Sequence, residues 1–203
     1  MKKIFIMFII CLFIIVSCDK NDTLKNADII FQSSNSGQAR AIAEATGSTY
    51  THMGLIYNTE EGRFVLEAVQ PVSVTRFEDW VQRGDNSHYV VKRLKKYKKY
   101  YISENFDKLK EYSKGMVGRD YDLYFEWSDE KLYCSELVYK IYANVFQIEL
   151  CAKKKLKDFD LDGEAVKELM KKRYGENVPY DETVVSPVDI FNSKLLYTVV
   201  SEN

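Results

Sequence analysis

Residues 132–146 read LYCSELVYKIYANVF, a segment with a clear helical pattern. Apolar residues fall at positions 134, 137, 138, 141, 142 and 145, the i, i+3, i+4, i+7 stripe of a helix packed on a core. Cys134 therefore lies in the first turn, where the helix dipole stabilises a thiolate, the nucleophilic form of cysteine. Backbone N–H groups at a helix start can also hold an oxyanion. A buried cysteine that acts only as a small apolar residue explains the position equally well.

Strand patterns dominate the chain before this helix. Apolar runs at 27–31, 52–57, 63–68 and 88–93 predict strands, and a turn at 58–62 joins the second and third into a hairpin. Residues 72–75 extend the sheet and 194–200 form a final strand. Helical patterns occur at 38–45, 77–82, 103–114 (with Ser103 as N-cap) and 162–173. Because strands come first and helices later, the fold class is α+β.

Composition places the chain among single-domain globular proteins. It has 203 residues, 46% of them hydrophobic, and a formal net charge of -1. This near-neutral charge gives no reason to expect a nucleic-acid partner. The basic run KRLKKYKK at 92–99 is most simply a solvated connection or helix face, with contact to an anionic lipid or polymer as the alternative.

The N-terminus has the pattern of a secretory signal. Lys2 and Lys3 precede an apolar run at 4–16, which is shorter than the roughly 20 residues of a transmembrane helix. Ser17-Cys18 resembles the lipobox of bacterial lipoproteins, which implies cleavage before Cys18 and its acylation. We expect a signal peptide at 1–17, a lipidated tether at 18–26 and one domain at 27–203, anchored to a membrane of the bacterial cell envelope. An uncleaved anchor, or an ordinary signal with an incidental cysteine, is the alternative.

The cysteine count changes once the signal is removed. Cys11 leaves with it and Cys18 becomes the anchor, so Cys134 and Cys151 remain. Cys134 lies in the first turn of the predicted helix and Cys151 beyond its far end, about 20 Å or more away, whereas a disulfide needs Cα atoms within about 7 Å. We predict that Cys134 is a free thiol, which invites a catalytic explanation.

The sequence contains only two histidines as candidate bases. His52 stands at a strand start behind a polar loop, and Gly54 leaves room beside it. His88 stands at a strand start beside a turn, and we interpret it as structural or exposed. An ordinary, non-catalytic role also fits His52.

Glu67 is the candidate third group, because it lies on the strand that pairs with the histidine strand. If Tyr57 opposes Gly62, then His52 opposes Glu67 directly. If Tyr57 opposes Arg63, Glu67 points to the other face of the sheet. The sequence leaves this choice open. An unpartnered carboxylate in an apolar strand would be costly, so we expect Glu67 to have a partner.

Several segments resemble a known family when they are taken in order. These segments are ADIIF at 27–31, ATGS at 45–48 with THMG at 51–54, LEA at 66–68, GRDYDLYF at 118–125, YCSELV at 133–138 and SP at 186–187. Together they resemble the YiiX/YaeF-like enzymes, circularly permuted relatives of the NlpC-type papain-like amidases, over almost the whole mature chain. Asn26-Ala27-Asp28 departs from the expected Gly-Asp pair, away from the chemistry.

The resemblance implies a permuted papain-like fold, in which an antiparallel sheet packs against helices and the cysteine lies at a helix N-terminus. It implies an amidase or peptidase with Cys134 as nucleophile, His52 as base and Glu67 as the polar third residue. Tyr121 is expected to line the site and assist the oxyanion, and Ser135 is predicted to contact the substrate or oxyanion as well. No zinc-ligand spacing and no glycine-rich phosphate loop occur, so no metal and no cofactor are expected.

Three functions remain open at this point. The first is an amidase or peptidase that acts on a peptide-like amide in the cell envelope. The second is a lipid-directed thioesterase or acyltransferase. The third is a non-catalytic binding lipoprotein.

Overall fold

The computed structural model describes residues 24–202. The signal peptide, Cys18 and most of the tether lie outside this range, so their assignments stay predictions. Within residues 24–202, no helix is both long and apolar enough to cross a membrane.

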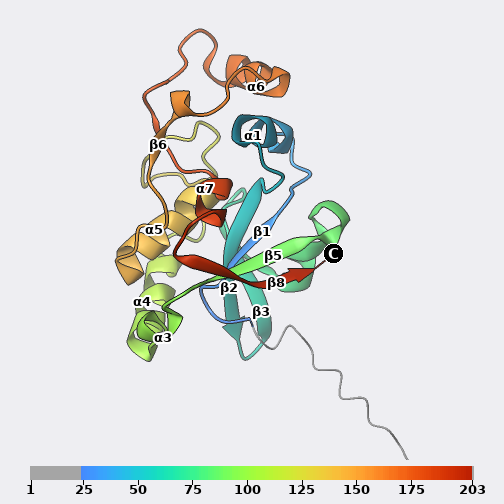
Figure 1. Cartoon of the computed structure of the whole chain (residues 1–203). Coiled ribbons are helices and arrows are strands. Elements are labelled where there is room, and N and C mark those ends of the chain that lie inside the picture. Colours follow the sequence, from blue (N-terminus) through green and yellow to red (C-terminus); the bar gives the residue numbers. More distant parts are fainter. Residues whose placement is uncertain (1–23, 203) are drawn as a thin grey trace, which may run out of the picture.

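An antiparallel sheet forms the centre of the molecule (Figure 1). Its strands are β1 (Ile29–Gln32), β2 (His52–Thr59), β3 (Gly62–Glu67), β4 (Ser73–Arg76), β5 (Tyr89–Leu94) and β8 (Leu196–Glu202). They lie in the order β4-β3-β2-β1-β5-β8, and each neighbouring pair is antiparallel. The α+β class with an antiparallel sheet is therefore confirmed.

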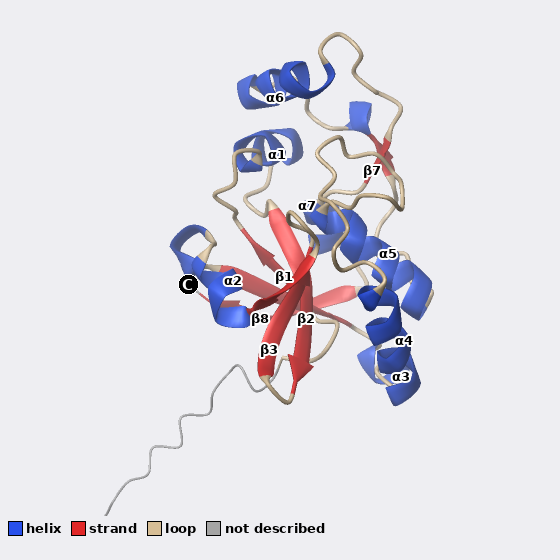
Figure 2. Cartoon of the chain, turned by 180° about the vertical axis from the view of Figure 1, so that it is seen from behind, coloured by secondary structure: helices blue, strands red, loops and turns tan. Residues whose placement is uncertain are grey.

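Helices cover both faces of this sheet, as Figure 2 shows. On one side lie α3 (Tyr97–Tyr100), α4 (Ser103–Lys114) and α5 (Cys134–Phe146), and on the other lies α2 (Phe77–Gln82). Beyond one end of the strands, α1 (Ala39–Thr46) packs against α6 (Glu164–Tyr174). The remaining elements are the 3-10 turns η2 (Asp85–Ser87) and η3 (Leu156–Asp158), the short pair β6 (Lys154–Lys155) and β7 (Thr183–Val184), and α7 (Pro187–Phe191).

The central strands are buried on both faces, which explains their continuous apolar runs. Along β1, Phe31 joins the core with Leu137 of α5, whereas Ile30 joins the opposite core with Trp80 of α2. Successive side chains of a strand point to opposite faces, so one strand supplies both cores.

Several predicted boundaries are wrong by a few residues. The main helix begins at Cys134 rather than at 132, because Tyr133 has an extended backbone (φ -100°, ψ 167°) and serves as its N-cap. The N-cap of α4 is Ile102, not Ser103. The hairpin turn is only residues 60–61, since Thr59 pairs with Gly62, so the predicted turn at 58–62 was too long.

The basic run at 92–99 is not solvated throughout. Lys92 and Arg93 belong to β5, and Arg93 is 6% exposed and pairs with Asp28 through two contacts of 2.6 Å. Lys92 Nζ lies 4.0 Å from the centre of the Phe191 ring. The position of Lys92 and Arg93 on β5, inside the sheet, explains why they are not solvated as the run of charges predicted. Lys95, Lys96, Lys98 and Lys99 are exposed, as expected.

Candidate active site

Cys134 is the first residue of α5 and only 3% exposed. The first N–H groups of an α-helix have no intrahelical acceptor, so those of Cys134 and Ser135 remain available to an oxyanion. Cys134 and Cys151 are both free thiols, which agrees with the sequence prediction. The thiol therefore sits where helix geometry favours a nucleophile.

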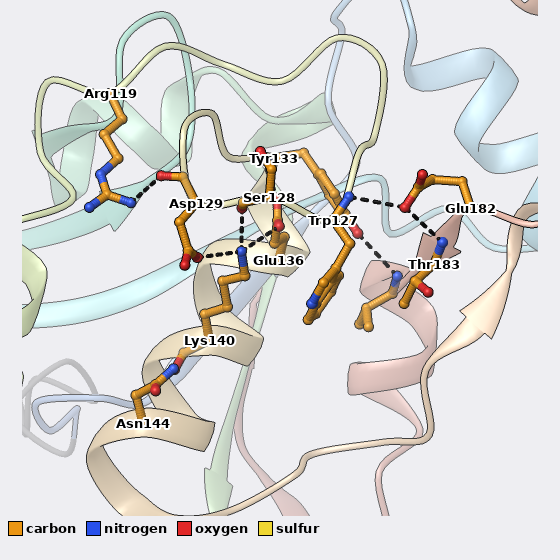
Figure 3. Close-up of polar contacts among 11 residues, drawn as sticks. Arg119, Trp127, Ser128, Asp129, Tyr133, Glu136, Lys140, Asn144, Glu182 and Thr183 are labelled. Carbon is orange, nitrogen blue, oxygen red and sulfur yellow. Dashed lines mark hydrogen bonds and ion pairs between the residues drawn. The ribbon is translucent and has the colours of Figure 1, made fainter. Parts of the chain in front are cut away.

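An ion cluster holds the loop before α5 against the helix, with Glu136 and Lys140 buried and Asp129 exposed (Figure 3). Lys140 Nζ lies 2.8 Å from Glu136 Oε1 and 2.7 Å from Asp129 Oδ1, and it donates to the Ser128 carbonyl. Burial raises the pKa of Glu136 to about 8, although Lys140 and the Tyr133 N–H lower it. The cluster joins the loop that precedes Cys134 to the first two turns of α5.

A second set of hydrogen bonds joins the start of α5 to the segment after β7. The Ser135 hydroxyl donates to the Val185 carbonyl (2.7 Å), and the Tyr133 hydroxyl accepts from the Val185 N–H (3.2 Å). Glu182 accepts from the Trp127 and Thr183 N–H groups nearby (Figure 3). The Ser135 hydroxyl is thus bonded within the fold, and its backbone N–H is the group left for an oxyanion.

His52 begins β2 and links the cysteine to a carboxylate. Its Nε2 lies 2.6 Å from Glu67 Oε2, and its ring stacks on Trp80 at 5.9 Å between centroids. Burial lowers the pKa of His52, but hydrogen bonds to Cys134 and Glu67 and their charges outweigh it and raise the pKa to about 9. The imidazole is therefore cationic at neutral pH.

The hairpin register differs from both alternatives considered for the sequence. Leu55 opposes Leu66, so Tyr57 opposes Phe64 rather than Gly62 or Arg63. His52 and Glu67 still share one face, because the shift from the first alternative is an even number of residues. They are diagonal neighbours and not a directly opposed pair.

Gly54, two residues after His52, permits the close approach of β2 to β3 beside Glu67. A Cβ at this position would fall 2.5 Å from Val65 Cγ1 and 2.7 Å from the Leu66 carbonyl oxygen. The sequence suggested that Gly54 leaves open space beside His52, but β3 fills that space.

Glu67 is fully buried and has the partners that its position demanded. Thr75 Oγ1 donates to Oε1 (2.5 Å), and Arg83 Nη2 forms an ion pair with the same oxygen. Burial raises the pKa of Glu67, but the bonds from His52, Thr75 and Arg83 bring it below the ordinary value. Thr75 and Arg83 were not among the site residues predicted from the sequence. Alternation along β4 could have placed Thr75 on the face of Glu67, but no local pattern marks Arg83.

Tyr121 lies beside Cys134, and its hydroxyl is hydrogen-bonded to Gln38, the N-cap of α1. Gln38 Nε2 donates to Tyr121 Oη (2.6 Å), and Arg173 Nη2 donates to Gln38 Oε1 (2.5 Å). Burial raises the pKa of Tyr121, and the charge of Cys134 raises it further. The phenol keeps its proton, and since it already accepts from Gln38, that proton is free for another acceptor.

Two hollows meet at these residues. The first, the apolar cavity, runs from Cys134 between α1 and α6 and is lined by Ala41, Ala45, Val166, Leu169 and Met170 among others. It is narrow, with a volume of about 80 Å³ accessible to a water-sized molecule. The second, the polar groove, is lined by residues that include His52, Gln70, Arg83, Tyr121, Lys172 and Arg173.

His88, interpreted from the sequence as structural or exposed, lines neither hollow. It is half-buried and stacks on Tyr50 at 6.5 Å between ring centroids.

An antiparallel sheet with a cysteine at the start of the helix packed on it, and with the histidine earlier in the chain, defines the permuted papain-like class of cysteine amidases. The chain belongs to the Peptidase_C92 family, described as the permuted papain-like amidase enzyme, YaeF/YiiX, C92 family, whose model matches residues 23–200. The resemblance seen in the sequence, the fold and the enzyme class are thereby confirmed.

Two relatives illustrate the match. The uncharacterized protein YiiX of Escherichia coli (strain K12) is 40% identical over 178 residues, which cover 88% of this chain and 87% of that protein. A solved structure described as metalloprotein YiiX from Escherichia coli O157:H7 superposes with a TM-score of 0.83 at 40% identity, and the match covers 88% of this chain and 98% of that one.

The description of that relative as a metalloprotein finds no counterpart in this part of the chain. Among residues 24–202, His, Cys, Asp and Glu side chains nowhere form a group of three or more that could hold a metal ion. The residues present do not fit a metal, and the chemistry below uses none.

Proposed function

We propose that this chain is a membrane-anchored cysteine amidase that hydrolyses an amide bond of a cell-envelope molecule, a peptide-like one, through Cys134, His52 and Glu67. One observation carries the proposal: the His52 imidazole is held by Glu67 at 2.6 Å and lies close enough to Cys134 for that residue to raise its pKa. Because Glu67 holds Nε2, Nδ1 is the nitrogen that serves the thiol. Base, orienting carboxylate and nucleophile then have the relationship of a catalytic triad.

The reaction follows from these positions. The Cys134 thiolate attacks the amide carbon, a C–S bond forms, and the carbonyl electrons move to oxygen. N–H groups at the start of α5 and the Tyr121 hydroxyl stabilise that oxyanion. The C–N bond then breaks as His52 gives its proton to the leaving amine, which leaves a thioester on Cys134.

Hydrolysis of the thioester completes the cycle. His52, now neutral, takes a proton from water, and the resulting hydroxide attacks the thioester carbon. The C–S bond breaks, the carboxylic acid departs, and the thiolate–imidazolium pair is restored. Each turn consumes one amide and one water and yields one acid and one amine.

Acyl-enzyme formation tests the catalytic part directly. A p-nitrophenyl ester is incubated with the purified full chain, and the acyl group is located by mass spectrometry. We expect acylation of Cys134 in the wild type and in Cys151→Ala, none in Cys134→Ala, and strong slowing in His52→Gln. Equal slow labelling of Cys134 and Cys151, indifferent to His52, would support the non-catalytic binding lipoprotein instead.

Membrane attachment has its own test. When a bacterium that expresses the full chain is fed an alkyne fatty acid, the label should appear on the wild type and on Cys11→Ser but not on Cys18→Ser. A Cys18→Ser variant that remains labelled and membrane-bound would contradict the lipid anchor.

The peptide-like substrate is tested by digestion of purified cell walls. New amine termini in the released peptides, absent with Cys134→Ala, are the expected result. Unchanged peptide profiles for every wall type would exclude a wall peptide as the substrate.

A lipid-directed thioesterase or acyltransferase is the second candidate, because an apolar cavity opens beside Cys134. Release of fatty acid from phospholipid vesicles, lost in Cys134→Ala, would favour it over the amidase.

A further inference from the structure

The basic run at 92–99 lies at the end of the sheet where the described chain begins. Strand β5, which carries the start of this run, pairs antiparallel with β1, so the run continues alongside the residues that precede β1. The backbone N–H of Lys25 and the guanidinium of Arg93 both donate to the Asp28 carboxylate, at 2.7 Å and 2.6 Å. Residues 24–28 and the basic run are therefore neighbours.

The reaction centre lies at the opposite end of the sheet. His52 is the first residue of β2, whereas Asn58, further along the strand, donates from Nδ2 to the Leu24 carbonyl at 3.3 Å. The stretch of strand between His52 and Asn58 spans about 20 Å. Figure 1 shows the same division, because α3 and the β2–β3 hairpin lie at the lower end and α1 and α6 at the upper end. A surface that covers the lower end therefore leaves His52 and the polar groove uncovered.

The lower end carries a surface that we call the basic face. Its centre is formed by exposed lysines that make no ion pair within residues 24–202, namely Lys95, Lys96, Lys98 and Lys99. Together with Tyr97 and Tyr197 they line one surface hollow. The two segments that build the face, 92–103 and 192–201, contain no Asp or Glu. The exposed charge of the basic face is therefore positive.

Apolar side chains border these lysines. Leu195, whose carbonyl accepts from the Lys95 N–H at 2.8 Å, is 42% exposed, and Ile102, which follows α3, is 46% exposed. Glu60 and Glu61 lie at the same end, but β1 separates their hairpin from β5. Lysines interleaved with tyrosine and exposed aliphatic side chains match a membrane surface, where anionic headgroups lie above the first apolar groups.

The proposed anchor holds this end of the sheet close to a membrane. Cys18, the predicted acylation site, precedes Leu24 by only six residues, which span at most about 20 Å when fully extended. The end of the sheet at Leu24 is therefore within that distance of the lipid. An anionic surface attracts each nearby lysine, an effect that falls off within a Debye length of about 10 Å.

We propose that the basic face docks on the anionic phospholipid surface of the membrane that holds the lipid anchor, and that docking turns the polar groove away from that membrane. This inference rests on the proposed membrane attachment. It goes beyond that attachment because it fixes the orientation of the domain. The reaction centre is presented to molecules on the aqueous side of the envelope and not to the lipids beneath the protein.

Lysine footprinting of the anchored full chain tests the orientation. The wild-type lipoprotein is placed in vesicles of phosphatidylcholine with phosphatidylglycerol, or of phosphatidylcholine alone, and is acetylated with a water-soluble reagent. Mass spectrometry compares the lysines of the basic face with Lys171 and Lys172, which are exposed on α6 at the other end. We expect severalfold lower acetylation of the basic face in the anionic vesicles only, with Lys171 and Lys172 unchanged.

Charge variants that lack the lipid test the face itself. In the full chain with Cys18→Ser, binding to the anionic vesicles is measured relative to the zwitterionic vesicles, so that the apolar run at 4–16 contributes to both. The test variant adds four substitutions on the basic face: Lys95→Gln, Lys96→Gln, Lys98→Gln and Lys99→Gln. The control variant removes the same charge from exposed lysines at the other end: Lys155→Gln, Lys157→Gln, Lys167→Gln and Lys171→Gln.

The test variant should lower the binding ratio by more than about a hundredfold, since each lysine near an anionic surface contributes about fivefold. The control variant should change it far less. Thermal unfolding midpoints of both variants are compared with that of Cys18→Ser first, so that a folding defect is recognised.

The outcomes separate the basic face from the anchor. Equal acetylation of the basic face in both kinds of vesicle, or equal binding by the test and control variants, would overturn the proposal. Protection of Lys171 and Lys172 instead would place the reaction centre against the membrane and favour the lipid-directed candidate. Protection of the basic face by soluble polyphosphate but not by vesicles would assign it to an anionic polymer. If fatty-acid labelling shows no lipid on Cys18 while the basic face still binds anionic vesicles, the anchor is wrong and the docking surface stands.

Discussion

His52 Nε2 lies 2.6 Å from Glu67 Oε2, although the two residues are not opposite one another in the β2–β3 pair. Because the two residues are diagonal neighbours, the Glu67 side chain extends along the strand to reach the His52 ring. Trp80 stacks on the face of the same ring. Glu67 receives two further donors, Thr75 and Arg83. The carboxylate is thus held in place before it orients the imidazole, which pre-organises the site.

Replacement of this carboxylate is the first prediction. Glu67→Gln removes the negative charge that holds both His52 and Arg83, so we expect amidase activity to fall by about a hundredfold. The pKa of His52 should fall as well, because one of its two stabilising partners loses its charge. Steady-state kinetics measure the first effect. Glu61→Gln, an exposed change in the hairpin turn, is the control, and equal activity of the two variants would contradict an orienting role.

The link between His52 and Cys134 can be observed in a proton titration. In the wild type, the ring signal of His52 should titrate near pH 9, since its hydrogen bond to Cys134 raises the pKa. Cys134→Ser removes the thiolate, so the midpoint should move to lower pH, whereas Cys151→Ser should leave it unchanged. NMR detects this readily because the chain has two histidines, and His88→Gln assigns the other signal. An unchanged midpoint in Cys134→Ser would disprove the pairing.

The buried carboxyl of Glu136, two residues after Cys134, predicts a dependence of stability on pH. Burial raises the pKa of Glu136 from 4.5 to about 8, so the folded state binds its proton more tightly than the unfolded state. The stability from this group is fully present below pH 4.5 and is lost as the pH rises through 8, with a slope of at most about 1.4 kcal/mol per pH unit.

Urea unfolding from about pH 5 to about pH 9 measures the contribution of Glu136 to the free energy of unfolding. Relative to Glu136→Gln, the wild type should lose free energy of unfolding as the pH rises. Glu130→Gln, an exposed substitution in the preceding loop, should follow the wild type. Parallel curves for wild type and Glu136→Gln would show that Glu136 does not titrate in this range.

Gly54 predicts a steric effect on both stability and activity. In Gly54→Ala the new Cβ would meet Val65 Cγ1 at 2.5 Å and the Leu66 carbonyl at 2.7 Å, so β3 must move. We expect a loss of about 1–3 kcal/mol in the free energy of unfolding, and reduced activity because Glu67 moves with β3. Gly115→Ala, whose Cβ would meet only the Tyr112 carbonyl at 3.5 Å, serves as the control for urea unfolding. A Gly54→Ala protein as stable and active as the control would refute the close approach.

Local patterns in the sequence predicted the main parts of this arrangement. The apolar stripe placed Cys134 in the first turn of the packed helix, and the paired strands brought His52 and Glu67 onto one hairpin. The register was missed because Asn58 and Gly62 look like turn residues, whereas the actual turn is Glu60-Glu61, which lacks the Asn-Gly signal of tight hairpins.

Contacts between distant segments could not be predicted in this way. Arg83 reaches Glu67 from the end of α2, and Arg93 is buried against Asp28, which immediately precedes the neighbouring strand β1. The apolar cavity depends on α1 packing against α6, helices more than a hundred residues apart in the sequence. Tertiary packing, not local propensity, creates these features.

The central claim is that His52 activates Cys134. The most direct measurement is the rate at which iodoacetamide alkylates Cys134 in the full chain across a range of pH, with Cys151 in the same molecule as internal reference. Burial raises the pKa of Cys151 to about 12, so its alkylation should be slow at neutral pH. We predict rapid alkylation of Cys134 at pH 7 in the wild type and a marked loss of that rate in His52→Gln but not in His88→Gln. Alkylation of Cys134 at the rate of Cys151, or at a rate that His52→Gln leaves unchanged, would contradict the account.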